Sequence, residues 1–154
     1  MPDDAVQALH LADDAATAAL GARLAGLCRP GDLVLLEGDL GAGKTALARA
    51  VIRALAADPG LDVPSPSFAL VQPYEAGGLA VIHADLYRLG GEGEVEELGL
   101  FDDPRALVLV EWPGRAPGLG DRADWRIALA LAPGGSGRVA RVWSRDGRAA
   151  GLAP

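Results

Sequence analysis

An eight-residue stretch of the chain has the composition of a phosphate-binding loop. Glycine, lysine and threonine stand at every fixed position of the pattern G-x-x-x-x-G-K-[ST]. In such a loop the glycines let backbone N–H groups surround a β-phosphate, the lysine reaches the β- and γ-phosphates, and the threonine hydroxyl ligates Mg²⁺. The candidate residues for binding a nucleotide are Gly38, Asp39, Leu40, Gly41, Ala42, Gly43, Lys44, Thr45 and Ala46.

Two carboxylates follow short apolar runs later in the chain. Residues 81–84 lead into Asp85, and residues 107–110 lead into Glu111. At the carboxyl ends of parallel strands both side chains would point toward the phosphates. One can then hold Mg²⁺ while the other orients the attacking water, although either can instead cap a neighbouring helix. The spacing does not assign the two roles.

The elements that position these residues alternate between helix and strand in the first part of the chain. Asp13 or Asp14 can cap a helix that runs to about Cys28, because apolar residues recur there at helical spacing. The apolar run 33–36 indicates a strand buried on both faces of a parallel sheet. The helix after the glycine-rich loop is predicted over 45–57.

Strands dominate the remainder. We predict strands over 68–74, 79–84, 107–110, 125–131 and 138–143, with a turn at 75–78 and a short acidic helix over 94–98. The predicted fold is an α/β sandwich of the P-loop NTPase type, whose mixed sheet has a parallel centre and antiparallel edges.

Composition limits the possible functions. A chain of 154 residues, half of them hydrophobic, fits a single domain over 1–154. The net charge of −7 disfavours autonomous binding to nucleic acid. An acidic N-terminus and the lack of a long apolar run predict a cytoplasmic protein without a membrane span. The single cysteine, Cys28, permits no internal disulfide.

Five segments in this order resemble the bacterial TsaE family, small ATPases required for threonylcarbamoyladenosine (t6A) modification of tRNA. The resemblance extends from about Asp14 to Val142. It departs from the family at Ser67, where threonine is usual, and at Ala84, where an aromatic residue is usual. The segments are 38–45, 65–68 (Ser-Pro-Ser-Phe), 83–89 (His-Ala-Asp-Leu-Tyr-Arg-Leu), 94–100 and 111–113 (Glu-Trp-Pro).

The resemblance implies a function that the residues alone do not. Members of the family bind ATP and ADP, hydrolyse ATP weakly when alone, and act on a complex of TsaD and TsaB. That complex transfers the threonylcarbamoyl group to adenosine 37 of tRNA, and ATP hydrolysis is thought to reset it between turnovers. The chain is therefore expected to meet tRNA only indirectly, through the complex.

The resemblance also implies roles for individual residues. Thr45 and Glu111 would hold Mg²⁺, and Asp85 would be a catalytic or metal-linked carboxylate. Lys44 and Glu111 are the other catalytic candidates. Ser67 would belong to a switch-like segment near the γ-phosphate. Thr17 matches a position near the nucleotide base, although helix capping is an adequate alternative. By its place in a glycine-rich turn, rather than by the resemblance, Arg138 is a further candidate for a phosphate contact, the alternative being that it contacts nothing.

Several alternatives stay open. A small-molecule kinase would use the same loop, but no arginine-dense lid segment stands between the loop and Glu111. A nucleotide-dependent binding switch would need no group to orient water. Trp112 is predicted at the rim of the site or in the core, and His83 alternates with apolar neighbours as a satisfied buried histidine would.

Overall fold

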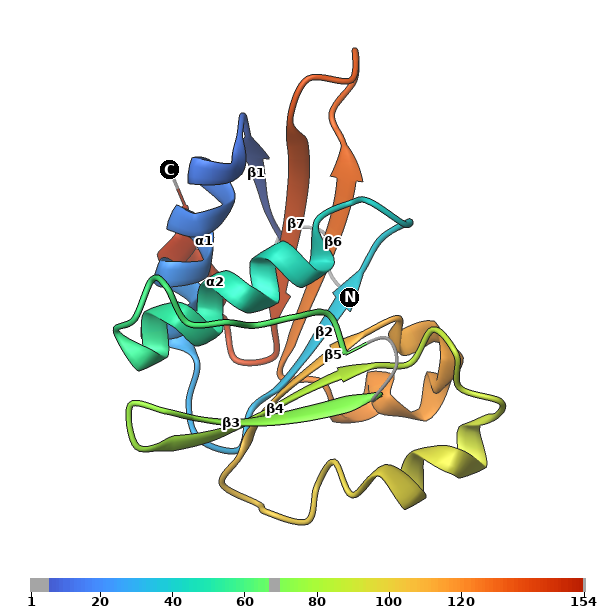
Figure 1. The fold of residues 1–154 in the computed structure, drawn as a ribbon. Helices are drawn as coiled ribbons and strands as arrows, with labels where there is room; N and C mark the ends of the chain where they lie inside the picture. The colour runs from blue at the N-terminus through green and yellow to red at the C-terminus, as the bar shows by residue number, and fades with distance from the viewer. Residues whose placement is uncertain (1–5, 67–69, 154) are drawn as a thin grey trace.

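The computed structural model describes residues 6–66 and 70–153, which form one seven-stranded sheet with two α-helices and several short 3₁₀ segments (Figure 1). The α-helices are α1 (Asp14–Leu27) and α2 (Lys44–Ala56). The strands are β1 (Gln7–Leu11), β2 (Leu33–Glu37), β3 (Val71–Ala76), β4 (Leu79–Asp85), β5 (Leu107–Glu111), β6 (Trp125–Leu131) and β7 (Arg138–Ser144). The 3₁₀ segments are η2 (Glu92–Leu98), η3 (Pro113–Arg115), η4 (Pro117–Arg122) and η5 (Arg148–Leu152).

The strand order is β1-β7-β6-β2-β5-β4-β3, with β2 at the centre. β2 pairs in parallel with both β5 and β6, and β4 pairs in parallel with β5. The outer pairs β3–β4, β6–β7 and β1–β7 are antiparallel. The predicted mixed sheet with a parallel centre and antiparallel edges is confirmed. Its register places Asp85 directly beside Glu111 at the carboxyl ends of two neighbouring strands.

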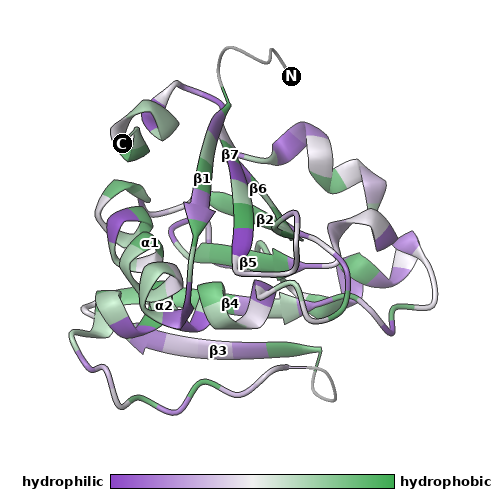
Figure 2. Cartoon of the chain, turned by 90° about the horizontal axis from the view of Figure 1, so that it is seen from above, coloured by the Kyte–Doolittle hydropathy of each residue, from purple (hydrophilic) through white to green (hydrophobic). Residues whose placement is uncertain are grey.

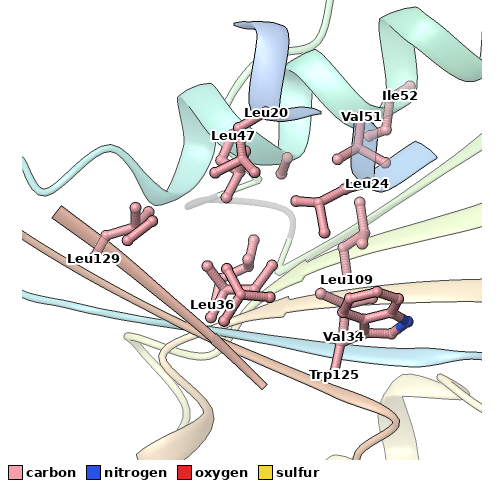
Figure 3. Packing of buried hydrophobic residues seen from close by; sticks show 14 of the residues in the cluster. Leu20, Leu24, Val34, Leu36, Leu47, Val51, Ile52, Leu109, Trp125 and Leu129 are labelled. Carbon is pink, nitrogen blue, oxygen red and sulfur yellow. The ribbon is translucent and has the colours of Figure 1, made fainter. Parts of the chain in front are cut away.

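The central strand is hydrophobic because both of its faces are covered. Val34 and Leu36 point to the face that α1 and α2 cover, where Leu20 and Leu47 pack against them (Figure 3). The alternate residues of β2 join a second core on the opposite face, under the 3₁₀ segments. Figure 2 shows β2 and β5 as hydrophobic strands, whereas the edge strand β3 carries polar residues.

The two helices cover the same face of the sheet and touch each other (Figure 1). They lie close together at Gly21 of α1, where an added Cβ would overlap the Cβ of Ala50 and lie 3.0 Å from the Ala50 carbonyl carbon. A side chain at this position would therefore push the helices apart. Because α2 begins in the glycine-rich loop, this contact also fixes where the loop lies relative to α1.

Most predicted boundaries agree closely with the structure. Asp13 caps α1, since its Oδ1 accepts a hydrogen bond of 2.9 Å from the Ala16 amide. Both helices end within a residue or so of the predicted limits, and β6 has the predicted range. The turn between β3 and β4 is narrower than predicted: Gly77 and Gly78 alone make it, with φ of 62° and 82°, as a tight hairpin requires.

Three features differ from the prediction or fall outside the description. β1 was not predicted, since its five residues become a strand only by pairing with β7 at the far end of the chain. The predicted acidic helix is a 3₁₀ segment that begins at Glu92. The start of the predicted strand 68–74 falls outside the described residues. Within the parts that are described, no helix has the length and apolarity needed to cross a membrane.

Candidate functional site

The glycine-rich loop leaves the carboxyl end of the central strand β2 and runs directly into α2. Gly43, the residue before α2, has φ of 103°, which is the left-handed region that favours glycine. Gly38 has φ of 145°, and a Cβ there would lie 2.5 Å from the carbonyl oxygen of Leu129. The two glycines are therefore required by the path of the backbone. The loop ends at the N-terminus of a 13-residue helix, where the helix dipole favours an anion.

Lys44 is buried at the first position of α2, with only 5% of its surface exposed. Its Nζ donates hydrogen bonds to the carbonyl oxygens of Gly38, at 2.6 Å, and of Asp39, at 2.9 Å. Burial lowers the pKa of Lys44 from its ordinary value, although the nearby carboxylates of Glu111 and Asp85 act in the opposite direction. The ammonium group is thus directed into the loop that carries the phosphate-binding pattern.

Glu111 lies behind the loop at the end of β5 and is 2% exposed. The hydroxyl of Thr45 donates to its Oε1 at 2.8 Å and to its Oε2 at 2.9 Å. On the other side, Nε2 of His83 lies 2.6 Å from Oε2. The structure therefore brings Thr45 and Glu111, the two residues that the family resemblance implies as Mg²⁺ ligands, into direct contact.

These oxygens fit a magnesium ion. Mg²⁺ is usually bound in nucleotide sites by one or two carboxylates together with substrate phosphates and water. Thr45 Oγ1 and the Glu111 carboxylate supply a hydroxyl and a carboxylate side by side at the phosphate end of the loop. In residues 6–66 and 70–153 no group of three or more histidine, cysteine or acidic side chains could hold a metal by itself. A site completed by phosphate oxygens needs no such group.

Asp85 ends β4 and is almost as buried as Glu111, with 5% exposed. Its Oδ1 accepts a hydrogen bond of 2.9 Å from the amide of Tyr87, so the carboxylate shapes the turn that follows the strand. Its own amide donates to the carbonyl of Leu70 at 2.9 Å. The structure thus places Asp85 beside Glu111, with part of its hydrogen-bonding capacity used by the backbone.

Arg138 reaches the loop from the other half of the sheet. Its Nη2 donates to the carbonyl oxygen of Gly41 at 2.9 Å, and its Nε lies close to Gly43. That Nε is buried and has no hydrogen-bond partner within the described part of the chain. Two cationic side chains therefore contact the loop: Lys44 from its C-terminal end and Arg138 from β7.

A groove of about 760 Å³ runs between α1 and α2. Thr17 and Ala46 both line this groove. Both are candidate nucleotide-binding residues from the sequence. Arg49 and Arg53 line the same groove, and alanines make up most of the remaining wall. Because Ala46 belongs to the first turn of α2, the groove begins beside the glycine-rich loop.

Two candidate residues are less enclosed or not described. Leu40, at the tip of the loop, is 71% exposed. Ser67 lies outside the described residues, so its predicted place near the γ-phosphate stays a prediction. The described residues on either side of Ser67 do approach the site. The Leu70 carbonyl accepts a hydrogen bond from the Asp85 amide, and the Leu70 amide donates to the carbonyl of Pro66 at 2.7 Å.

Two contacts of the site were not predicted. The ring centroid of Trp112 lies 4.2 Å from Lys44 Nζ and 4.9 Å from the ring centroid of Tyr87. The hydrogen bond between His83 and Glu111 was also missed. The sequence indicated only that His83 shares a face of its strand with Asp85, whereas the contact with Glu111 depends on the register between β4 and β5.

Comparison with known proteins gives one matching family. The family model "Threonylcarbamoyl adenosine biosynthesis protein TsaE" matches residues 11–137, which include Lys44, Thr45, Asp85 and Glu111 but stop before Arg138. Relatives named tRNA threonylcarbamoyladenosine biosynthesis protein TsaE occur in Rickettsia conorii and Streptomyces coelicolor. They are 41% identical over 97 residues (62% of this chain and 55% of the relative) and 43% identical over 95 residues (60% and 64%), respectively. The chain therefore matches less than two thirds of the length of these relatives.

A longer match and a structural match agree with this result. A relative of the same name from Nostoc is 36% identical over 124 residues, or 76% of this chain and 74% of the relative. The crystal structure of Bacillus subtilis YdiB superimposes with a TM-score of 0.71 at 24% identity, covering 96% of this chain and 91% of that one. The likeness to YdiB confirms the fold. Because the family model spans most of the residues that carry the site, the chain is a member of the TsaE family.

Proposed function

We propose that the chain is a Mg²⁺-dependent ATPase that serves the synthesis of t6A in tRNA. The observation that carries the proposal is the direct contact of Thr45 with Glu111 behind a complete phosphate-binding loop. A loop that only bound an anion would need the helix N-terminus and the lysine. A buried carboxylate held against the threonine hydroxyl is what a metal-dependent phosphoryl transfer needs in addition.

Each residue has a defined task in this proposal. The loop amides and Lys44 bind the β- and γ-phosphates, and Thr45 and Glu111 hold Mg²⁺, which neutralises charge that develops on the transferring phosphoryl group. Asp85 lies beside Glu111 and orients the attacking water. Arg138 adds a second positive charge at the loop. Thr17 and the start of the groove between the helices receive the nucleoside end of the nucleotide.

The partners follow from the family and agree with the charge. Relatives of this chain are named for the biosynthesis of threonylcarbamoyladenosine in tRNA. A net charge of −7 makes direct binding of the chain to tRNA phosphates unfavourable. The chain would therefore act on a protein complex of TsaD and TsaB, and its ATP hydrolysis would return that complex to the state that begins the next threonylcarbamoyl transfer to adenosine 37.

Reconstitution with purified components tests this function. TsaD, TsaB and the enzyme that supplies threonylcarbamoyl-adenylate are combined with tRNA and ATP, and modified adenosine is counted per complex with and without the chain. We expect addition of the chain to convert a single turnover into many. Glu111→Ala should abolish this effect, whereas Glu75→Ala, which changes an exposed glutamate on the edge strand β3, should retain it.

Two outcomes would contradict the proposal. Multiple turnovers without the chain, or with Glu111→Ala, would show that its ATPase activity is not what the complex requires. A chain that hydrolyses ATP but leaves tRNA modification unchanged would favour the small-molecule kinase, and candidate phosphate acceptors would then be screened.

A further inference from the structure

His83 is a buried polar residue to which the proposed reaction gives no task. It lies on β4, pairs with Leu109 of β5, and shares its face of the sheet with Asp85. None of its surface is exposed. A histidine in this position needs a reason, since a buried ring nitrogen without a partner loses the hydrogen bonds that water would supply.

The contacts of the ring determine where its hydrogen lies. Nε2 is 2.6 Å from Glu111 Oε2, and Nδ1 is buried without a partner in the described residues. An ionised carboxylate only accepts hydrogen bonds, so Nε2 carries the hydrogen and donates it. Nδ1 then bears only a lone pair, which is less costly to bury without a partner than an N–H group would be.

The hydrogen bond from His83 distinguishes the two oxygens of Glu111. The hydroxyl of Thr45 is nearly equidistant from them, at 2.8 Å and 2.9 Å, and so does not fix the rotation of the carboxylate. His83 contacts Oε2 alone. Oε1 therefore keeps only the Thr45 hydroxyl as its hydrogen-bond partner within the described chain, and it is the oxygen less committed to protein contacts.

We propose that His83 is a positioning residue, whose N–H to Oε2 fixes the Glu111 carboxylate in the rotation that presents Oε1, beside the Thr45 hydroxyl, to the metal ion. The inference rests on the proposed metal site formed by Thr45 and Glu111. It assigns His83 no contact with the nucleotide and no proton transfer. Its loss should therefore weaken metal binding without weakening nucleotide binding in the absence of metal.

The test measures metal affinity directly. Mn²⁺ is titrated into the intact chain saturated with ADP, and free Mn²⁺ is followed by electron paramagnetic resonance. We expect His83→Leu to weaken Mn²⁺ binding by about ten- to a hundredfold, the range of a hydrogen bond to a charged group. His83→Gln should recover most of the affinity, because its amide N–H extends about as far from the backbone as Nε2 does. ADP affinity in the presence of a chelator should be similar in all variants.

A matched control separates positioning from packing. Val81→Ala removes two methyl groups from a fully buried side chain on the same face of β4, two residues before His83, and leaves Glu111 and His83 unaltered. It should lower the melting temperature yet leave Mn²⁺ affinity unchanged. If His83→Leu does not fold, His83→Asn replaces it, since the shorter amide does not reach Oε2 and should bind Mn²⁺ more weakly than His83→Gln.

Three results would overturn the inference alone: wild-type Mn²⁺ affinity in His83→Leu, equal affinities in the asparagine and glutamine variants, or an equal loss in Val81→Ala. A different result would overturn the proposed metal site itself, namely a wild-type chain that binds ADP but shows no Mn²⁺ site. The two failures are distinguishable because the second appears before any substitution is made.

Discussion

The indole ring of Trp112 covers the ammonium group of Lys44, with 4.2 Å between the ring centroid and Nζ. Trp112 directly follows Glu111 and has a left-handed backbone, with φ of 57°, which is uncommon for a bulky residue. Its ring also packs against Tyr87. The Trp112 side chain thus connects the end of β5 to Lys44, and a charge that approaches Lys44 also approaches this ring.

The fluorescence of Trp112 should therefore report nucleotide binding. Phosphate groups at Lys44 would change the electrostatic environment of the indole, so ADP should alter tryptophan emission in the wild type. Trp112→Phe should abolish the change, and Trp143→Phe, which alters a half-buried tryptophan on β7, should preserve it. A change that persists in Trp112→Phe would mean that the signal comes from elsewhere.

The hydroxyl of Thr45 should matter for turnover more than for nucleotide binding. Thr45→Val removes the group that donates to both oxygens of Glu111, and we expect ATP hydrolysis to fall by about tenfold or more. Nucleotide affinity measured with a chelator should change little. Thr45→Ser, which keeps the hydroxyl, should retain most of the activity, and steady-state phosphate release compares the three proteins. Equal activity of the valine and serine variants would remove Thr45 from the metal site.

Arg148 should be important for the stability of the fold because it forms a largely buried ion pair with Asp32. Its guanidinium makes two hydrogen bonds to Asp32, at 2.8 Å and 3.1 Å, in a pair whose side chains are 12% and 9% exposed. Arg148→Ala would leave that carboxylate without its cation and should lower the free energy of unfolding by about 3 kcal/mol. Urea denaturation measures this. Arg29→Ala breaks only an exposed pair and should change it by less than about 0.5 kcal/mol, so equal effects would contradict the prediction.

The close contact between the helices makes a pair of glycine substitutions informative. Gly21→Ala would introduce a Cβ that overlaps Ala50, and we expect a loss of about 1–3 kcal/mol in the free energy of unfolding. Gly26→Ala, in the same helix, meets no atom within 4 Å and should stabilise by up to about 1 kcal/mol, because alanine favours helix. Thermal or urea unfolding compares them. If both substitutions changed the free energy of unfolding by the same amount, the helices would be able to separate without strain.

Cys28 should make the fold less stable in alkaline solution. Burial, helped by the nearby Asp32 carboxylate, raises the pKa of its thiol from 9.0 to about 12. The unfolded chain therefore loses this proton at lower pH than the folded chain does, so this contribution to stability falls as pH rises from 9.0 toward about 12. Between about pH 8 and about pH 10.5, the unfolding free energy of the wild type should fall relative to that of Cys28→Ala. Rapid alkylation of the folded thiol at about pH 8 would contradict it.

The features that could be predicted from the sequence are those that depend on residues close together in the chain. The loop, its helix and the carboxylates of β4 and β5 were predictable, because a glycine pattern and an apolar run ending in an acid are signals within a few residues. The partner of His83 was not, since it depends on the register between two strands. The left-handed backbone of Trp112 was not predictable either, because a bulky residue rarely adopts it.

The central place of β2 has a consequence for the order in which the chain can fold during synthesis. Both neighbours of β2 come much later in the sequence: Val34 pairs with Leu109 on one side and with Trp125 on the other. The strand that carries the nucleotide loop thus leaves the ribosome with two apolar faces and no partner. Long-range pairing of this kind is slow and exposes hydrophobic surface until it is complete. A nascent chain that stops before β5 would contain the whole glycine-rich loop but neither of the strands that flank β2 in the sheet.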